Sequence, residues 1–514
     1  MPHHPNKWVV AGTVLLGTIM AVLDSSVVNV ALPEMSGTLG ATIEEITWVV
    51  TAYILAQVIF MPITALLSAR FGRKNFYLAS VVLFTAASMA CGAARSMPMM
   101  VLFRVIQGAG SGVMITVSQA ILRESFPPEE QGTAMGIFGF GTVLAPAIGP
   151  TLGGWLTDQY SWPWVFYVNV PIGVIAVLLV TRFVEDPPYL VRHKGQIDWA
   201  GVGAMTVGLG ALQLMLEKGQ EKDWFQSALI VWLTVIAAVF LVLFIWRELK
   251  TSRPAVDLSL FRNVPFASAT TLGGVLGMGL YGALFLLPLF LQQLLGYPAM
   301  KSGLALMPRS LAMAVCMPIG GLLYNRLGPR VLVGTGLAVS AFSFWDLAHL
   351  STDTGIWDIV LPQVWQGVGF SMLFVALSTA ALSTIDRPRM TAASGLYNVV
   401  RQVFGSVGIA VAATELVRSQ ARYHDVLAEH VTPYGMATQQ YLHGATAGMM
   451  AAGADVVTAT GRAIRLLDVR VLRQATALAY NHVLMLVAAL FAVSLPLVLL
   501  VRGHRDAKVD MAAE

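Results

Sequence analysis

Two charged side chains lie within long apolar stretches, where their types could support proton chemistry. Asp24 falls in LDSSVVNVALP (23–33) and Arg104 in LFRVIQGAGSG (102–112). A charge at the centre of a bilayer costs roughly 2.5–3.5 kcal/mol on insertion scales, and such residues usually line a path or a proton relay. Burial opposes the ionised form of a carboxyl group and a nearby cation favours it, so Asp24 is a candidate to gain and lose a proton. A carboxylate that is satisfied by neighbouring helices is the structural alternative.

The two charges are expected at similar depths in the membrane. If the first and fourth apolar segments run in opposite directions, Asp24 is about nine residues and Arg104 about five residues from the same membrane face, at ~1.5 Å per residue. Both side chains then lie in the outer half of the bilayer. We hypothesise that Arg104 stabilises ionised Asp24 and is displaced when a proton or a substrate arrives.

A further apolar segment, over 141–154, reads GTVLAPAIGPTLGG and is rich in glycine and proline. In a soluble helix glycine costs about 1 kcal/mol and proline about 3 kcal/mol relative to alanine. In a membrane, neighbouring segments can satisfy the freed backbone groups, and small residues allow close helix approach. The segment therefore predicts either a tight packing face or a bendable, tightly packed hinge. Its candidate residues are Gly141, Gly149, Pro150, Gly153 and Gly154.

Two pairs of similar segments indicate an internal repeat. ALLSARFGRK (65–74) matches GLLYNRLGPR (321–330), with Gly72 aligned to Gly328, and RVIQG (104–108) matches QVWQG (363–367). The offsets are nearly equal, which predicts two six-helix halves, and Gln363 then stands where the first half has Arg104. The motif or gating candidates in these segments are Arg70, Gly72, Arg73, Lys74, Gln107, Gly108, Arg326 and Gly328.

Other polar residues in apolar segments are candidates to line a substrate cavity. They are Asn29, Gln363, Asn398, Arg401 and Arg309. Arg309 has two open interpretations, because it could pair with Asp346 near the end of another span or could bind substrate. Proton coupling is expected in the N-terminal half, since the second half has glutamine in place of Arg104.

The composition is that of a polytopic membrane protein. The chain has 514 residues, of which 56% are hydrophobic and 12% are charged, and its mean hydropathy is +0.70. Soluble globular proteins carry about 25% charged residues. Cys91 and Cys316 lie inside apolar runs, so no disulfide framework is expected. Fourteen spans are predicted, at about 9–32, 47–67, 76–94, 99–122, 132–156, 164–184, 199–216, 225–246, 266–291, 302–324, 331–350, 358–384, 392–415 and 480–501.

Basic residues predict the orientation of these spans, because cytoplasmic loops carry an excess of Lys and Arg. The short connections on one side hold only Arg95, Lys218, Lys222 and Lys301. The connections on the other side, with the two termini, hold many more, among them Arg192, Lys194, Arg253, Arg502, Arg505 and Lys508. Both termini are therefore expected in the cytoplasm.

The predicted domains are an N-terminal six-helix bundle (1–184), a linker with two inserted spans (185–262) and a C-terminal six-helix bundle (263–514). The C-terminal bundle contains a long extracytoplasmic loop at about 416–479. The later part of this loop reads RAIRLLDVRVLRQATALAY, in which apolar residues recur at helical spacing with arginines between them. A surface helix, a partner-binding element and a capped external loop are all compatible with it.

The motifs resemble those of the major facilitator superfamily. Gly149-Pro150 and Gly153-Gly154 are similar to the antiporter signature of fifth helices in its drug exporters. The loop at 65–74 resembles the loop signature of the superfamily, with Ala65 and Ala69 in place of its usual glycine and aspartate.

Three further segments extend the resemblance to the fourteen-helix drug:proton antiporter family of the EmrB type. The segment around Asp24 resembles the first-helix signature, and the segment around Arg104 resembles the fourth-helix signature. WPWVFYVNVPIG (162–173) resembles a stretch of the same exporters, although its aromatic residues are mostly expected to anchor the span at the membrane boundary.

The resemblance implies an all-α major facilitator fold, with two six-helix bundles plus two extra transmembrane helices, 14 in total. It implies proton-coupled export of amphipathic toxic compounds by alternating access, with Asp24 and Arg104 in proton coupling. Export of one specific metabolite, siderophore or fatty acid shares every motif and is the alternative. A bacterial inner (plasma) membrane is implied and, in a two-membrane bacterium, a periplasmic membrane-fusion adaptor and an outer-membrane channel as partners.

Patterns of soluble enzymes are absent from the sequence. No GxxxxGK[ST] phosphate-binding loop, HExxH or CxxC is found. We therefore expect no catalytic residue, no metal, no cofactor and no nucleic-acid partner, and a proton gradient as the energy source. A membrane-embedded enzyme would need a polar cluster with catalytic spacing, and a structural or sensor role would predict no transport after reconstitution.

Overall fold

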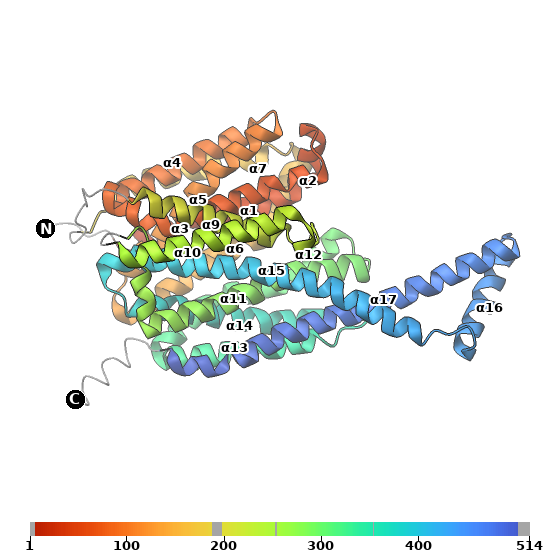
Figure 1. Ribbon diagram of the computed structural model, residues 1–514. Coiled ribbons are helices and arrows are strands. Elements are labelled where there is room, and N and C mark those ends of the chain that lie inside the picture. Colours follow the sequence, from red (N-terminus) through yellow and green to blue (C-terminus); the bar gives the residue numbers. More distant parts are fainter. Residues whose placement is uncertain (1–5, 188–197, 252–253, 353, 502–514) are drawn as a thin grey trace.

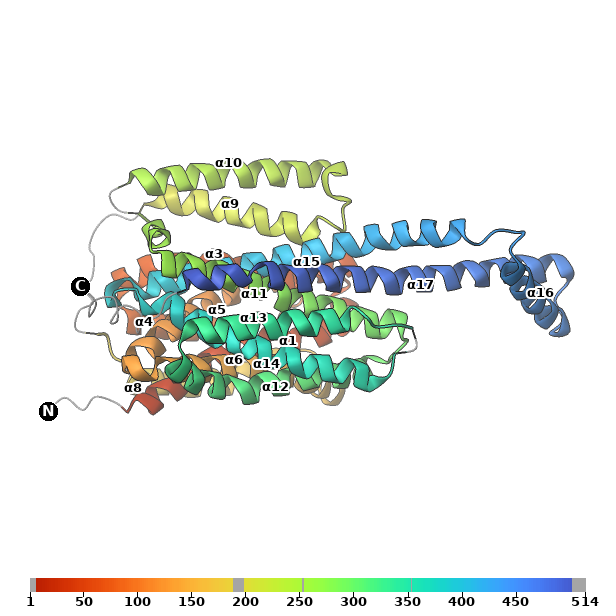
Figure 2. The same ribbon diagram turned by 90° about the horizontal axis from the view of Figure 1, so that it is seen from below.

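The computed structural model describes residues 6–187, 198–251, 254–352 and 354–501. Within these ranges the chain forms long helices and no strand, and the helices run side by side in one elongated bundle (Figures 1 and 2). A helix satisfies all its backbone hydrogen bonds internally, which is what a chain in hydrocarbon requires. The basic residues Arg192, Lys194, Arg253, Arg502, Arg505 and Lys508, which entered the orientation argument, lie outside the described residues.

Thirteen helices in the described ranges are long and apolar enough to cross a membrane. The helix α13, at the predicted eleventh span, lies beside α14 and α17 in the bundle and carries Arg330 and Asp346 near its ends, and with it the fourteen predicted spans are accounted for. The all-α fold is thus confirmed, and each of the fourteen predicted spans has a helix in the structure.

The helices of the N-terminal half pack against one another, with α1 against α5, α6 and α8. Their bounds are α1 Lys7–Leu39, α2 Ile43–Ile46, α3 Trp48–Phe71, α4 Arg73–Gly92, α5 Met97–Ser125, α6 Gln131–Gln159, α7 Trp164–Tyr167 and α8 Asn169–Phe183, with a 3-10 turn η1 at Pro128–Glu130. Two helices, α9 Trp199–Lys218 and α10 Ala228–Lys250, follow and pair with each other beside the bundle (Figure 2).

The C-terminal half repeats this arrangement, with α11 packed against α14 and α15. Its helices are α11 Val264–Leu289, α12 Ala299–Leu327, α13 Pro329–Leu347, α14 Ile356–Ser383, α15 Met390–Glu429, α16 Met436–Ala451 and α17 Val456–Val493. Short turns are η2 Trp224–Gln226, η3 Leu258–Arg262, η4 Phe290–Leu294, η5 Arg387–Arg389 and η6 Leu495–Leu500.

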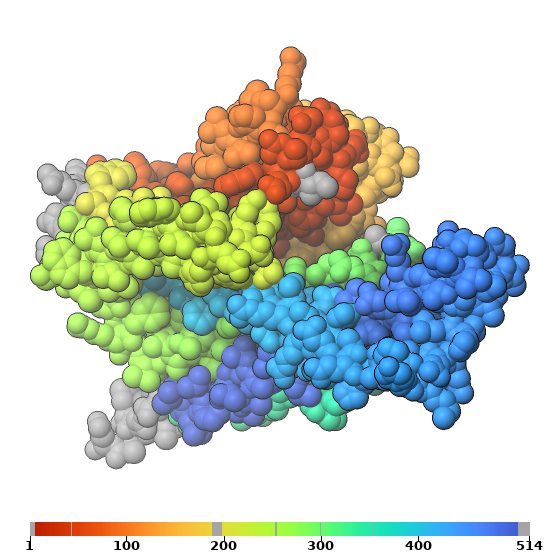
Figure 3. Space-filling view, turned by 45° about the vertical axis from the view of Figure 1, so that its right-hand side comes forward, coloured from red at the N-terminus to blue at the C-terminus, as the bar shows by residue number. Residues whose placement is uncertain are grey.

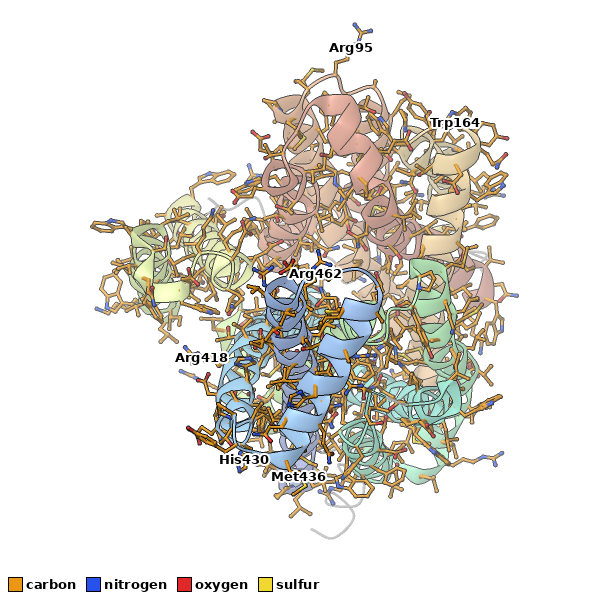
Figure 4. All side chains as sticks on the ribbon, turned by 90° about the vertical axis from the view of Figure 1, so that its right-hand side faces the viewer. Arg95, Trp164, Arg418, His430, Met436 and Arg462 are labelled. Atoms are coloured by element: carbon orange, nitrogen blue, oxygen red, sulfur yellow. The ribbon has the colours of Figure 1, made fainter. Side chains whose placement is uncertain are left out.

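The bundle has two ends, which we name by what lies there. The terminal face is the end at which α1 begins and η6 ends, and the extension face is the opposite end (Figure 1). Residues 416–479, which we call the extension, project from it: α15 and α17 run on beyond the bundle, and α16 packs against α17 near the tip. Figure 4 looks onto this face, with Arg95 and Trp164 marking the N-terminal half and Arg418, His430, Met436 and Arg462 the extension. The long connection is thus largely helical.

The two halves are joined near the terminal face. In the described part of the chain, hydrogen bonds that cross between the halves lie there: Asn325 bonds Thr133 at 3.3 Å, and Gln119 accepts from Ser394 and Asn398 at 2.7 Å each. The helices α6 and α12 come so close that a Cβ on Gly132 would lie 2.5 Å from the Gly321 carbonyl oxygen. Towards the extension face the surface is hollowed between the halves (Figure 3).

Candidate functional site

The polar centre of the N-terminal half is Asp24, on α1. Both carboxylate oxygens accept hydrogen bonds from neighbouring helices. Arg104 of α5 donates its Nη1 to Oδ2 in an ion pair, and both side chains are fully buried. Gln107 Nε2 donates to Oδ1 at 2.7 Å, and Asn169 Nδ2 of α8 donates to the same oxygen at 2.9 Å. The structure therefore brings Asp24 and Arg104 into direct contact, where sequence could place them only at similar depths.

Each donor in this cluster is itself held in place. Arg104 Nε donates to the Val49 carbonyl at 2.7 Å, and its guanidinium lies over the Tyr53 ring, 4.2 Å from the ring centre. Arg104 Nη1 also donates to Gln107 Oε1 at 2.8 Å, which orients the amide towards Asp24. Hydrogen bonds to charged groups are the stronger class in proteins, and burial among α1, α3, α5 and α8 leaves them unscreened by water.

Two members of the cluster were not identified as site residues from sequence. Asn169 lies in the segment at 162–173, whose aromatic residues predict mostly an anchoring role at the membrane boundary. Ser88, on α4, accepts from Asn169 Nδ2 at 3.1 Å and donates to the Phe166 carbonyl at 2.9 Å. Only the asparagine gave a usable signal, as an amide side chain within an apolar stretch, since a lone serine in a membrane helix is common.

The glycine-proline segment of α6 packs against α1, within the N-terminal half. A Cβ on Gly149 would lie 2.6 Å from Ser26 Cβ, and a Cβ on Gly153 would lie 2.7 Å from the Val27 carbonyl oxygen. Both contacts fall on the turn of α1 that follows Asp24. Gly141 faces Leu15, which lies in an earlier turn of α1. A Cβ on Gly154 would have no neighbouring atom closer than 3.8 Å.

This packing predicts different effects for two adjacent glycines. Gly153→Ala is expected to lower the free energy of unfolding by about 1–3 kcal/mol, because its methyl group forces α1 and α6 apart. Gly154→Ala is the matched control and should leave stability unchanged or raise it slightly, since alanine favours a helix over glycine by about 1 kcal/mol. Thermal unfolding of the purified variants in one detergent compares them. Equal effects at both positions would contradict close α1–α6 packing at Gly153.

The basic loop candidates lie at the terminal face. Gly72 and Gly328 end α3 and α12 with φ of 87° and 80°, which a residue with a side chain rarely adopts. Arg73 is buried and pairs with Glu124 of α5 at 2.6 Å, so a glutamate from another helix takes the counter-charge that Ala69 cannot supply. Lys74 Nζ donates to the Thr181 carbonyl at 2.8 Å, while Arg70 and Arg326 are exposed in the last turns of α3 and α12.

The cavity candidates have different surroundings. Asn29 is exposed in the second half of α1, whereas Asn398 is buried and bonded to Gln119 where the halves meet. Arg401 is half-buried, and its guanidinium lies 5.0 Å from the ring centre of Phe374. Gln107 belongs to the Asp24 cluster, and Gly108 lies against the backbone of Tyr53.

Arg309 and Gln363 lie inside the C-terminal half. Arg309 is 3% exposed and donates Nη1 to Gln366 Oε1 at 3.3 Å. Among the described residues, no ion pair joins it to Asp346, so the suggested pairing with Asp346 is wrong. The reason is that Arg309 faces α14, whereas Asp346 lies on α13, on which α12 packs far less. Gln363 is fully buried, and neither of its amide atoms has a hydrogen-bond partner there.

Two helical halves, joined at one face and hollowed between them at the other, with a buried ion pair in one half, are an arrangement found in many secondary transporters. The protein is accordingly a multi-pass membrane protein. The chain belongs to the Major Facilitator Superfamily, whose family model matches residues 14–409. The predicted superfamily is thus confirmed.

Known relatives cover most of the chain. It is 38% identical over 429 residues to the multidrug export protein EmrB of Haemophilus influenzae, covering 83% of this chain and 84% of that protein. It is 35% identical over 490 residues to the fatty acid resistance protein FarB of Neisseria gonorrhoeae, covering 95% and 94%. Among solved structures, the human organic anion transporter MFSD10 shares the fold, with a TM-score of 0.62, 14% identity, and coverage of 96% of this chain and 100% of that chain. The predicted EmrB-type relationship is confirmed by these matches.

Proposed function

We propose that this protein exports amphipathic toxic compounds in exchange for protons, by alternating access of its two halves. The observation that carries the proposal is the buried cluster around Asp24. Arg104, Gln107 and Asn169 all present N–H groups to its oxygens, an arrangement that satisfies a carboxylate. A proton added to Asp24 removes the charge that Arg104 neutralises and displaces at least one of these donors. Proton binding therefore changes the contacts among α1, α5 and α8.

The glycine contacts link this change to the movement of the halves. Gly149 and Gly153 hold α6 against the turn of α1 after Asp24, while the other end of α6 packs on α12 of the opposite half. A shift of α1 is thus transmitted to the junction between the halves. Because that junction lies at the terminal face, the structure corresponds to a state open towards the extension face.

The orientation follows from the charge of the loops. We assign the terminal face to the cytoplasm of a bacterial inner membrane, because basic residues concentrate there. The hollow then opens outward, and the extension stands in the extracytoplasmic space. In a two-membrane bacterium, a membrane-fusion adaptor and an outer-membrane channel would receive the exported compound on this side. The energy source is the proton gradient, and the proposal needs no cofactor or metal.

Two kinds of relative support different breadths of substrate. Proteins named for multidrug export match 82–83% of the chain, which favours a broad range of amphipathic compounds. The fatty acid resistance protein matches 95% of it, extension included, so export of a fatty acid is the second candidate.

Transport by the purified protein in vesicles tests the proposal. With an imposed pH gradient, we expect movement of a fluorescent amphipathic cation and of an amphipathic acid, in the direction opposite to the protons. The control is the same vesicle with the gradient collapsed by an ionophore. Movement of a fatty acid alone would favour the second candidate, and no gradient-dependent movement of any compound in a broad panel would refute proton-coupled export.

A further inference from the structure

The two halves share packing contacts as well as similar sequence segments. Gly108 on α5 lies against the backbone of Tyr53 on α3, and Gly367 on α14 lies against the backbone of Arg309 on α12, where a Cβ would be 2.5 Å from the carbonyl oxygen. Gly110 and Gly369 make a second matched pair, each with a Cβ position about 3.0 Å from a backbone oxygen, of Ser80 and of Gly336. The packing of α3 and α4 on α5 is thus reproduced by α12 and α13 on α14.

This correspondence places Arg309 at the position of Tyr53. Tyr53 and Arg309 are 256 residues apart in the sequence, the same separation as Gly72 and Gly328. Gln363 and Gln366 then correspond to Arg104 and Gln107, at the offset of 259 residues that relates Gly108 to Gly367. The C-terminal half therefore has its own polar centre at the place where the N-terminal half holds the Asp24 cluster.

The two centres differ in charge balance. In the N-terminal half the cation of Arg104 is neutralised by Asp24. In the C-terminal half α11 contains no aspartate or glutamate, so no carboxylate faces Arg309 from this helix. Within the described residues Arg309 has no ion pair, and its hydrogen bond is the one to the neutral amide of Gln366. A buried cation without a counter-charge is costly, by several kcal/mol in proteins.

The unused hydrogen-bonding groups point to what would fill the site. Gln363 is fully buried with both amide atoms unpaired, and Gln366 Nε2 is also unpaired, among the residues described. Gln363 and Gln366 are three residues apart and share one face of α14, the face that meets Arg309. A guanidinium and two amide N–H groups are donors, and a carboxylate accepts all three at once.

We infer that Arg309, Gln363 and Gln366 form an anion-binding site that takes the carboxylate of an amphipathic substrate. This inference rests on the proposed function and extends it by naming a substrate class. In its described part, the protein itself provides no negative charge to balance Arg309. A bound carboxylate therefore supplies in the C-terminal half the negative charge that Asp24 supplies in the N-terminal half.

Equilibrium binding without a proton gradient tests the site separately from transport. Radiolabelled dodecanoate and dodecyltrimethylammonium, which share a chain length and differ in charge, are measured on the protein in lipid nanodiscs, with empty nanodiscs subtracted. Arg309→Gln is expected to weaken dodecanoate binding about tenfold or more, the effect of losing a charged hydrogen bond, and to leave the cation unaffected. Arg309→Lys keeps the charge but loses the planar fork, so its affinity for dodecanoate should lie between the two.

Gln366→Glu is a second, independent variant. It has the shape of the native side chain and places a carboxylate beside Arg309, so it should raise the unfolding temperature and abolish dodecanoate binding. Both changes together exclude a simple folding defect as the cause of lost binding. A lower unfolding temperature with unchanged dodecanoate binding would overturn the inference.

Further outcomes would refute the anion site, its substrate assignment or the proposed function. Wild-type affinity for dodecanoate in Arg309→Gln, or equal loss of both amphiphiles, would refute the site. If chloride raises the unfolding temperature but dodecanoate does not bind in chloride-free buffer, the assignment of a carboxylate substrate is refuted. If vesicles show no gradient-driven transport while dodecanoate binding depends on Arg309, the proposed function fails and the anion site stands. If Arg309→Gln binds dodecanoate normally and wild-type transport is intact, the function stands and the site fails.

Discussion

Replacing Asp24 by asparagine is expected to reduce gradient-driven export to the rate seen in protein-free vesicles. Asparagine has nearly the same size and keeps an oxygen that can accept from Arg104, but its amide cannot take up a proton. The exchange of a proton for a substrate therefore loses its chemical basis. The measurement is dye movement in vesicles with and without the pH gradient.

Asp346→Asn is the matched control for this experiment. It makes the same chemical change in a half-buried carboxyl group of α13, which belongs to the other half of the bundle from the Asp24 cluster. Its transport should equal that of the wild type. The opposite pattern, with transport lost in Asp346→Asn and retained in Asp24→Asn, would move the proton site to the C-terminal half.

Arg104→Gln is expected to be the most destabilising single change in the site. It leaves Asp24 as a buried charge without a cation, and breaking a buried ion pair in this way costs about 3–5 kcal/mol. The variant also loses the hydrogen bond to the Val49 carbonyl and the contact with the Tyr53 ring. The free energy of unfolding, measured by denaturant titration in mixed micelles, gives the effect.

The double variant Asp24→Asn, Arg104→Gln shows whether the loss comes from the pair. Because it removes both charges, its free energy of unfolding should recover part of what Arg104→Gln loses, and the difference measures the coupling between the two side chains. Strict additivity of the two single effects would mean that Asp24 and Arg104 do not depend on each other. The free energy of unfolding of Arg104→Lys should lie between those of the wild type and Arg104→Gln, since a lysine keeps the charge but cannot reach Asp24, Gln107 and Val49 together.

Depth and charge allowed part of the site to be predicted from sequence. Asp24 and Arg104 are conspicuous because each is a charge within an apolar stretch, well away from the charged ends of its helix, and the helical rise gives their depth. The sequence could not give the lateral placement of α8, so Asn169 was missed, although it donates to the same oxygen as Gln107. Nothing in the sequence marks Ser88 as a site residue, because its role is to accept a hydrogen bond from Asn169, which lies on another helix.

The C-terminal half was harder to predict for a related reason. Arg309 and Asp346 are opposite charges in neighbouring spans, which made their pairing plausible. Which face of a helix meets which neighbour is set by small-residue packing, here by Gly367 against the backbone of Arg309. That contact turns Arg309 towards α14 and Gln366. Its correspondence to Tyr53 is invisible in the sequence because the two residue types share no chemistry.

The extension shows the limit of span prediction. The predicted spans at 392–415 and 480–501 were bounded by hydropathy, but α15 continues to Glu429 and α17 begins at Val456. A helix does not end where lipid ends, and the apolar spacing in residues 462–480 indicates a helix in the sequence itself. The arrangement of α15 and α17 side by side depends on contacts between them that no local pattern records.

Proton release on substrate binding tests the central role of Asp24 most directly. Purified protein in weakly buffered detergent solution, started at a pH where the site is protonated, is mixed with an amphipathic cation, and the pH change is followed with an indicator dye. The account predicts that the wild type releases protons in proportion to the substrate bound and that Asp24→Asn binds the substrate without releasing any. Equal release from both proteins would show that another group exchanges the proton and would contradict the account.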